Sequence, residues 1–493
     1  MSIIFAGNYK ILFLISLNKD LKTEFMKFQF KTIKLITLSL FLATAFSCSN
    51  DDDEPLPIVI ADTTVPVITL TGDAAVTIEV GATYTDQGAT ATDDIDGDIT
   101  SSIVEVSTVD IAVSGTYTVT YNVTDASGNE AAEVTRTVNI TPVPEVTAPN
   151  TYLFERGGTT TVSYNGQSSR LNMSVALFNM LNVANVDASK LLQMFNEGTG
   201  FADAALNDSG KKLGNKTASY GDATVQPKIA GFLTEYAEDV STKFNDNAEA
   251  GVAGSYTGSG GRTVRVNGKG MELNQVFAKS LIGALVMDQV AYGYLSETKI
   301  GDDVDNDASA LGAGEYTTME HHWDEGLGYV YGQEDDIETA ATPQGNGVLF
   351  NKYLKKVSAD GKEEPGLGAI IYDAFKLGRA AIVAGDATVK NEQAEIVKTK
   401  MSRVILHKAA YYLRGAAVAK EASSIDYADY FHGLSEGYGF VLSLQFTYSA
   451  DGTSYFSHTE VAAMLATLEA GNGFWDVTAE DLNAMAASIE AKI

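Results

Sequence analysis

Two stretches of the chain, EYTTMEHHWDEGLGYVYG at 315–332 and DYADYFHGLSEGYGFVLS at 426–443, follow one pattern. In both, a histidine is followed four residues later by Glu-Gly-x-Gly, an aromatic residue and valine. Each copy follows a long apolar segment with helical periodicity, at 273–295 before the first and at 398–419 before the second. The repeat predicts a duplicated helical hairpin and therefore two pseudo-symmetric helical bundles. Chance similarity between two amphipathic helices is the alternative.

The histidine and glutamate of each copy are the candidate ligands of a metal ion. On a helix, residues three or four apart are neighbours on one face. His321 and His322 therefore both adjoin Glu325, and the second copy pairs His432 with Glu436. If the two copies meet, these imidazole and carboxylate groups can share an Fe or Zn ion. The alternative is a histidine and a glutamate hydrogen-bonded at a helix-packing surface.

The paired glycines of the repeat favour this packing alternative. Glycine inside a helix costs about 1 kcal/mol relative to alanine. Two glycines in each copy therefore indicate the close approach of another backbone. The repeat still contains the candidate site, because the chain has only five histidines and two of them fall at equivalent positions.

The composition indicates an acidic, multi-domain globular protein. The chain has 493 residues, enough for two or three domains. It has 34 Lys and Arg residues against 64 Asp and Glu residues, and its net charge is −30. Such a surface repels phosphate backbones, which argues against nucleic acid as a partner.

The first 47 residues have the composition of a signal region. A basic stretch and a short apolar run precede Cys48, the only cysteine, and we expect the true start at Met26. The segment resembles a bacterial lipoprotein signal, which implies that Cys48 is lipidated; a transmembrane anchor is the alternative. The acidic tether at 48–65 contains Ser-Asn-Asp-Asp-Asp-Glu and resembles the export tag of Bacteroidetes surface lipoproteins. That resemblance implies a lipid-anchored outer-membrane protein exposed on the cell surface.

Residues 66–141 alternate between β-branched and polar side chains and are interrupted by turn signals, a pattern typical of a β-sandwich. The motifs Asp-Thr-Thr-Val-Pro from 62, Asp-Asp-Ile-Asp-Gly-Asp from 93 and Gly-Thr-Tyr-Thr-Val-Thr-Tyr from 115 resemble bacterial Ig-like domains of the DUF5011 type. The resemblance implies a spacer module between the membrane anchor and the following domain.

One loop of this module concentrates carboxylates. Asp93, Asp94, Asp96 and Asp98 crowd it and can ligate Ca²⁺ through their oxygen atoms. The alternative is an Asx-turn, in which these side chains accept hydrogen bonds from their own backbone. The sequence shows no ligand from elsewhere in the chain.

A proline-containing linker at 142–150 precedes a mainly helical domain at 151–493. Helical periodicity is clear in five segments: 225–244, 273–295, 367–384, 392–419 and 481–493. Two capping signals, Ser457-x-x-Glu460 and Thr478-x-x-Asp481, predict the starts of two late helices.

The stretches TYLFERGG from Thr151 and GQSSRLNM from Gly166, together with the first repeat copy, resemble the DUF4856 family of Bacteroidetes lipoproteins. The layout more remotely resembles the imelysin-like proteins, which implies two pseudo-symmetric bundles and a link to iron acquisition. Their G-x-H-x-x-E signature is matched by His322 and Glu325, but Glu320 occupies the glycine position.

The sequence contains no H-E-x-x-H, G-x-S-x-G, P-loop or strand-bound G-x-G-x-x-G motif. We therefore assign no catalytic residues. The function that we expect is a surface-exposed outer-membrane lipoprotein that binds a metal ion or a metal-bearing ligand for uptake, together with an outer-membrane transport partner. A structural or protein-interaction lipoprotein and a hydrolase with an unrecognised site are the alternatives.

Overall fold

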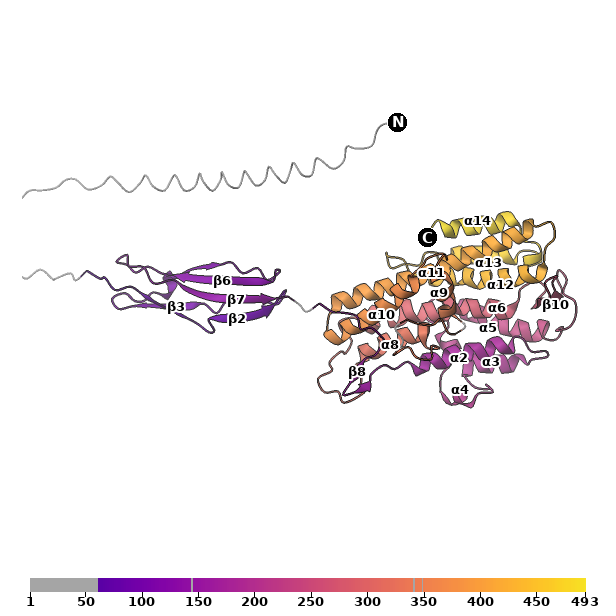
Figure 1. Ribbon diagram of the computed structural model, residues 1–493, viewed down its shortest axis with the longest axis horizontal. Coiled ribbons are helices and arrows are strands. Elements are labelled where there is room, and N and C mark those ends of the chain that lie inside the picture. The colour runs from indigo at the N-terminus through magenta and orange to yellow at the C-terminus, as the bar shows by residue number, and fades with distance from the viewer. Residues whose placement is uncertain (1–60, 143–144, 340–341, 348) are drawn as a thin grey trace, which may run out of the picture. The chain divides into compact units, whose positions relative to one another are not determined.

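The computed structural model describes residues 61–142, 145–339, 342–347 and 349–493 (Figure 1). The predicted signal region, the lipidation site Cys48 and most of the acidic tether lie outside these residues. The chain divides into two compact units between residues 143 and 144. Among the described helices, none has the length and apolar character needed to cross a bilayer.

The first unit is the predicted β-sandwich. One sheet has the strand order β2-β7-β6-β5, with β2 (Ala75–Glu79) parallel to β7 (Val134–Thr141) and the remaining pairs antiparallel. The other sheet has the order β1-β3-β4. The remaining bounds are Val67–Leu70 (β1), Ala89–Asp93 (β3), Gly97–Asp98 (β4), Val104–Ser107 (β5) and Gly115–Asn122 (β6).

Every second residue of the long strands enters the core of this unit. Val119 and Tyr121 of β6 face inward, as do Val138 and Ile140 of β7. The buried Arg136 side chain forms an ion pair with Asp86. Burial raises the pKa of Asp86, but hydrogen bonds from Arg136 and two tyrosines hold it well below its ordinary value.

The second unit is mainly helical, as predicted. Its bounds are Asn165–Met180 (α2), Ala188–Glu197 (α3), Ala204–Asp208 (α4), Val225–Glu235 (α5), Leu273–Leu281 (α6), Glu297–Ile300 (α7), Thr318–Tyr331 (α8), Phe350–Ser358 (α9), Leu367–Ala384 (α10), Ala387–Glu421 (α11), Tyr427–Ser443 (α12), His458–Glu469 (α13) and Ala479–Glu490 (α14). Two short hairpins accompany them, Glu155–Arg156 (β8) with Thr159–Thr160 (β9) and Gly254–Thr257 (β10) with Thr263–Val266 (β11).

The capping motifs lie where the sequence predicted them. Ser457 and Glu460 form a capping box at the start of α13, and Thr478 and Asp481 form one at the start of α14. In each box a side-chain oxygen accepts a hydrogen bond from a backbone amide that has no partner within the helix, which fixes the helix start.

A central helix organises this unit. It consists of α6 and its π-helical continuation η4 (Ile282–Tyr294), and almost all of its residues are buried. The repeat helix α8 packs against η4, whereas the repeat helix α12 packs against both α6 and η4. Both copies contribute to one continuous hydrophobic core. Instead of forming the cores of two separate bundles, the copies therefore share one core around the central helix.

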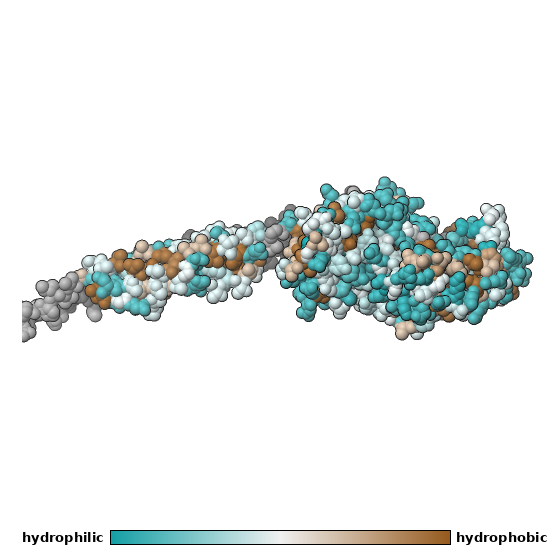
Figure 2. Space-filling model, turned by 90° about the horizontal axis from the view of Figure 1, so that it is seen from below, coloured by the Kyte–Doolittle hydropathy of each residue, from teal (hydrophilic) through white to brown (hydrophobic). Residues whose placement is uncertain are grey.

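The surface of the helical unit is largely hydrophilic on the face that Figure 2 shows, with scattered hydrophobic patches. Exposed apolar side chains of this unit include Tyr411 and Val418, both on α11. These two residues border the cavities described below.

Candidate functional site

The first copy of the repeat places its histidine and glutamate on one face of α8. His321 Nε2 lies 3.9 Å from Glu325 Oε1, and the His321 ring stacks on Tyr316 with 4.6 Å between the ring centroids. Glu325 accepts hydrogen bonds from Gln167 Nε2 at 2.8 Å and from the Tyr294 hydroxyl at 3.3 Å. This carboxylate therefore links α8 to α2 and to the central helix.

His322 points to a different partner. Its Nδ1 donates to the carbonyl of Lys299 at 2.8 Å, and Lys299 Nζ donates to its Nε2 at 3.3 Å. Burial lowers the pKa of His322. Both ring nitrogens thus have hydrogen-bond partners from Lys299, so His322 is held in place by α7.

The second copy differs in detail. His432 Nδ1 donates to Glu272 Oε2 at 2.7 Å, so its partner lies at the start of α6. Glu436 accepts from Lys279 Nζ at 3.0 Å and from the Tyr353 hydroxyl at 2.8 Å. Burial raises the pKa of Glu436, but Lys279 and the tyrosine hydroxyls lower it to about 2 overall. Glu436 is therefore a buried, ionised acceptor.

The structure does not bring the two copies together as a shared metal site. Within the described ranges, no group of three potential ligand atoms lying close together includes a histidine or glutamate of the repeat. The physical reason is that Glu325 bonds to residues of α2 and η4, whereas Glu436 bonds to residues of α6 and α9. The common feature of the copies is a glutamate that ties neighbouring helices together.

The second glycine of each copy allows close helix packing. A Cβ atom on Gly328 would lie 2.4 Å from Tyr164 Cβ, and one on Gly439 would lie 2.4 Å from Lys279 Cβ. Neither distance is compatible with a side chain. These contacts support the packing explanation of the glycines.

A buried ion network on α8 was not predicted from the sequence. Arg379 of α10 is fully buried and donates to Asp324 Oδ1 at 3.1 Å and to Glu320 Oε1 at 3.0 Å. The Tyr152 hydroxyl also donates to Asp324 Oδ1, at 2.8 Å. Because this network is closed off from solvent, we interpret it as a structural link between α8, α10 and the start of the helical unit.

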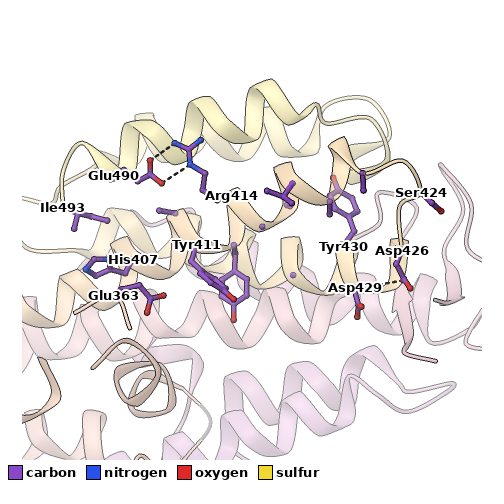
Figure 3. Close-up of a pocket in the computed structure, with 18 residues that line it drawn as sticks. Glu363, His407, Tyr411, Arg414, Ser424, Asp426, Asp429, Tyr430, Glu490 and Ile493 are labelled. Atoms are coloured by element: carbon purple, nitrogen blue, oxygen red, sulfur yellow. Dashed lines mark hydrogen bonds and ion pairs between the residues drawn. The ribbon is translucent and has the colours of Figure 1, made fainter. Parts of the chain in front are cut away.

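A largely apolar groove of about 810 Å³ lies along α11 (Figure 3). Small side chains line much of it, among them Ala410, Gly415 and Ala419. The ion pair between Arg414 and Glu490 of α14 borders it, with Nη2 and Oε2 2.6 Å apart. We call this cavity the α11 groove.

A second cavity, of about 770 Å³, lies next to the groove and shares Glu363, Tyr411 and Tyr412 with it. We call it the lysine pocket. Its lining consists of these three residues and of Lys355, Lys356, Ala359, Gly361, Lys362 and Lys408. This lining of four lysines and one glutamate contrasts with the net charge of −30 of the whole chain.

Two of the four lysines have polar partners. Lys408 Nζ lies 2.6 Å from Glu363 Oε1, and Lys355 Nζ donates to the carbonyl of Gln344 at 2.6 Å. Lys356 and Lys362 are exposed and form no ion pair within the described residues. The pocket therefore offers ammonium groups that a bound anion can contact.

The aspartates predicted as a calcium loop adopt two arrangements. Asp93 Oδ1 accepts from the backbone amide of Ile95 at 2.9 Å, as in the Asx-turn alternative. Asp98 Oδ1 accepts from the amide of Thr100 at 3.0 Å and takes no part in the carboxylate cluster around Asp93. Asp93 itself, Asp94 and Asp96 lie close to Asp62 or Asp125, which come from elsewhere in the chain.

Comparison with known proteins identifies both units. The model of a family described as a domain of unknown function, DUF4856, matches residues 149–493. The chain belongs to this family. A second model, described as the Ig-like domain of bacterial surface proteins, matches residues 68–140. No curated protein matches the chain.

Two solved structures resemble part of the chain. One is a lipoprotein from Bacteroides thetaiotaomicron, 25% identical, with a TM-score of 0.15; the match covers 16% of this chain and 39% of that one. The other contains the CBM51-2 domain, in complex with GlcNAc, and INT domains of Clostridium perfringens ZmpB, 34% identical, with a TM-score of 0.14; the match covers 16% of each chain. The chain thus spans well under half the length of either structure.

Proposed function

We propose that this chain is a cell-surface lipoprotein whose helical domain binds an anionic organic ligand with an apolar or aromatic part. The observation that carries the proposal is the lysine pocket beside the exposed Tyr411. Lipidation of Cys48 in the outer membrane supplies the anchor. The Ig-like module lies between this anchor and the helical domain in the sequence, as a spacer would.

The charge of the pocket supports an anionic ligand. Partial burial of the Lys356 side chain and the like charges of Lys352 and Lys408 lower the pKa of Lys356, although Glu436 raises it. Positive groups held close together repel one another, and a bound anion relieves this repulsion. The pocket is also a local attractive region for anions on a molecule that otherwise repels them.

The aromatic and apolar surroundings support a ligand with an apolar part. Tyr411 is 57% exposed, and Lys408 Nζ lies 4.6 Å from the centroid of its ring. An exposed aromatic ring offers flat contact area to a ring or chain of the ligand. The α11 groove continues from Tyr411 with small apolar side chains, so the charged and apolar parts of one ligand have adjoining places.

An anionic metal chelate belongs to this ligand class, and we include it in the proposal. Such a ligand carries its own metal-binding atoms, so the protein needs no set of converging histidines and glutamates. In this proposal, a metal-bearing ligand is bound for uptake through a transport partner without a metal site shared by the repeat copies.

Calorimetric titration of the protein with benzoate, acetate and benzyl alcohol tests the proposal. Benzoate combines the charge of acetate with the ring of benzyl alcohol, so we expect its Kd to be at least tenfold lower than that of either probe. A tenfold lower Kd corresponds to about 1.4 kcal/mol of binding free energy. The double variant Lys356→Ala, Lys362→Ala should weaken benzoate binding at least tenfold. The matched control Lys190→Ala removes an exposed lysine outside the pocket and should not change the Kd.

Absence of benzoate binding, or equal binding by the parent and the double variant, would contradict the proposal. Titrations with the ferric complex of 2,3-dihydroxybenzoate and with the metal-free compound then test whether the protein prefers a metal-bearing ligand. Tighter binding of the ferric complex supports uptake of a metal chelate, whereas equal or weaker binding rejects that part.

A protein-interaction role is the second candidate, and the α11 groove favours it. Val418 in this groove is 69% exposed, although it is apolar. Exposed apolar side chains grouped in a groove are typical of protein contact sites. This role predicts that none of the three small probes binds.

A further inference from the structure

Five aspartates from three separate parts of the chain converge at one end of the Ig-like module. Asp62 precedes β1, and Asp125 follows β6. Asp93 is the last residue of β3, and Asp94 and Asp96 belong to the β3–β4 turn. Asp62, Asp93 and Asp94 offer oxygen atoms that all lie within 4.8 Å of one another, and so do Asp62, Asp96 and Asp125. We call these five residues the aspartate cluster; Asp62 is common to both groups.

Two oxygen atoms of the cluster have no partner. Oδ2 of Asp62 and Oδ2 of Asp93 are buried, and no described residue donates a hydrogen bond to either. A buried carboxylate oxygen without a hydrogen bond or a positive charge is costly. The aspartate cluster therefore lacks a positively charged group that would compensate these oxygen atoms.

The module itself cannot supply that group. Arg136 is its only Lys or Arg residue between 61 and 142, and it is buried in the ion pair with Asp86. Five carboxylates thus gather in a segment of the chain that contains no free basic side chain. The negative charges of these carboxylates repel one another, and the repulsion would fall if the side chains turned apart. The fold nevertheless holds them together.

Hydrogen bonds hold several of the carboxylates in position. Asp96 Oδ2 accepts from the amide of Ala126 at 2.7 Å, and Asp94 Oδ2 accepts from the Thr64 hydroxyl at 3.3 Å. Asp125, only 8% exposed, accepts from the side-chain amide of Asn129 at 2.7 Å. Each of these bonds connects or orders a different loop, and such supporting contacts are typical of the surroundings of a metal site.

We propose that the aspartate cluster binds Ca²⁺. Its ligands are exclusively hard oxygen atoms, which suit Ca²⁺ and Mg²⁺ rather than transition metals. Ca²⁺ accepts six to eight oxygens in flexible geometry, which suits several carboxylates from different loops, whereas Mg²⁺ requires near-ideal octahedral geometry. Water completes the coordination.

Bound Ca²⁺ fixes where the polypeptide joins the module. It bridges the segment at Asp62, near the end of the tether, to the β3–β4 turn and to the segment after β6. The sequence alone suggested Asp98 instead of Asp62 and Asp125, because it showed only the neighbours within one loop. In the structure, Asp62 and Asp125 take part in the cluster in place of Asp98. Each lies about 30 residues from the loop in the sequence, one before it and one after it.

Calorimetric titration of the EDTA-treated protein with CaCl₂ and with MgCl₂ tests this site. The protein from residue 49 onward is used, because it keeps every described residue. We expect Ca²⁺ to bind with a Kd of about 10⁻³ M or lower, the range of extracellular modules, and at least tenfold more tightly than Mg²⁺. Asp62→Asn and Asp93→Asn should each weaken Ca²⁺ binding at least tenfold.

Asp98→Asn is the matched control, because Asp98 belongs to the same loop but not to the cluster; its Kd should stay within threefold of the parent value. Circular dichroism of each variant without Ca²⁺ checks that the substitutions leave the fold intact. Absence of Ca²⁺ binding to the parent protein, equal affinity for Mg²⁺, or unchanged binding in a folded Asp62→Asn variant would overturn the proposal.

Discussion

At the residue scale, the repeated glutamates differ in the charge of their partners. Glu325 accepts hydrogen bonds from the neutral groups of Gln167 and Tyr294, whereas Glu436 accepts from the buried ammonium of Lys279. Removing one member of a buried ion pair leaves the other charge without compensation. Glu436 should therefore contribute more to stability than Glu325, although the two occupy equivalent positions of the repeat.

Glu436→Gln should lower the free energy of unfolding of the helical unit by about 3–5 kcal/mol, because it leaves Lys279 buried without its partner. The matched change Glu325→Gln should cost only about 1 kcal/mol, since it alters hydrogen bonds between neutral and charged groups in a less buried setting. Urea unfolding followed by circular dichroism at pH 7 measures both values. Equal losses in the two variants would contradict the ion-pair explanation.

The pH dependence of stability follows from the lowered pKa of Glu436. Because this pKa is about 2 in the folded state against an ordinary value of 4.5, the ionised form stabilises the fold. The contribution is complete above about pH 4.5 and is lost as the pH falls toward 2. The stability difference between the parent and Glu436→Gln should therefore shrink over this interval in acid titrations. A constant difference would show that folding does not lower the pKa of Glu436.

At the scale of the elements, α8 and α12 pack against one central helix, and the second glycine of each copy allows a neighbouring segment to approach closely. The helical periodicity, the apolar faces and the capping signals of these helices could be predicted from the sequence, because they depend on residues close together in the chain. The segments against which the helices pack could not be predicted in this way. Gly328 contacts Tyr164 of the segment before α2, and Gly439 contacts Lys279 of α6, and such contacts are decided by the tertiary fold.

Gly439→Ala should destabilise the helical unit by about 1–3 kcal/mol, because its Cβ would lie 2.4 Å from Lys279 Cβ. Gly433→Ala on the same helix is the control, since a Cβ there meets nothing within 4 Å. Its higher helix propensity should stabilise the unit by about 0.5–1 kcal/mol. Thermal unfolding of both variants provides the comparison, and a loss at Gly433 as large as that at Gly439 would argue against the packing role.

The candidate binding site was only partly visible in the sequence. Lys352, Lys355, Lys356 and Lys362 fall within eleven residues of an acidic chain, and this local reversal of charge is a detectable signal. Lys408 and Tyr411 come from α11, so their arrival at the same pocket depends on packing between α9 and α11. The histidines drew attention because they are rare, but their hydrogen bonds go to separate helices.

At the scale of the whole molecule, two units with separate hydrophobic cores share one acidic chain. The core of the Ig-like module contains Ile140, and the core of the helical unit contains Leu285. No described residue belongs to both cores. The two units should therefore unfold as separate cooperative transitions.

Differential scanning calorimetry should resolve this independence. Ile140→Ala and Leu285→Ala each remove a buried side chain and should cost about 2–5 kcal/mol. The first should lower the Tm of one transition and the second the Tm of the other. A single transition that shifts equally with both variants would indicate that the units unfold together.

The net charge of the whole molecule affects where an anionic ligand can bind. Most of the molecule repels anions, so an anionic ligand is attracted only where basic side chains gather. The lysine pocket provides such a place, with Tyr411 as an aromatic wall and the α11 groove as the adjoining apolar surface. Binding should accordingly weaken as the salt concentration rises.

The most direct test of the proposed function is a crystal structure with 4-bromobenzoate, because the anomalous signal of bromine locates the ligand. We predict that the carboxylate lies in the lysine pocket within hydrogen-bond distance of Lys356 or Lys362, and that the bromine lies beside Tyr411 or in the α11 groove. A bromine peak at another place on the molecule, or no peak at saturating concentration, would contradict the account.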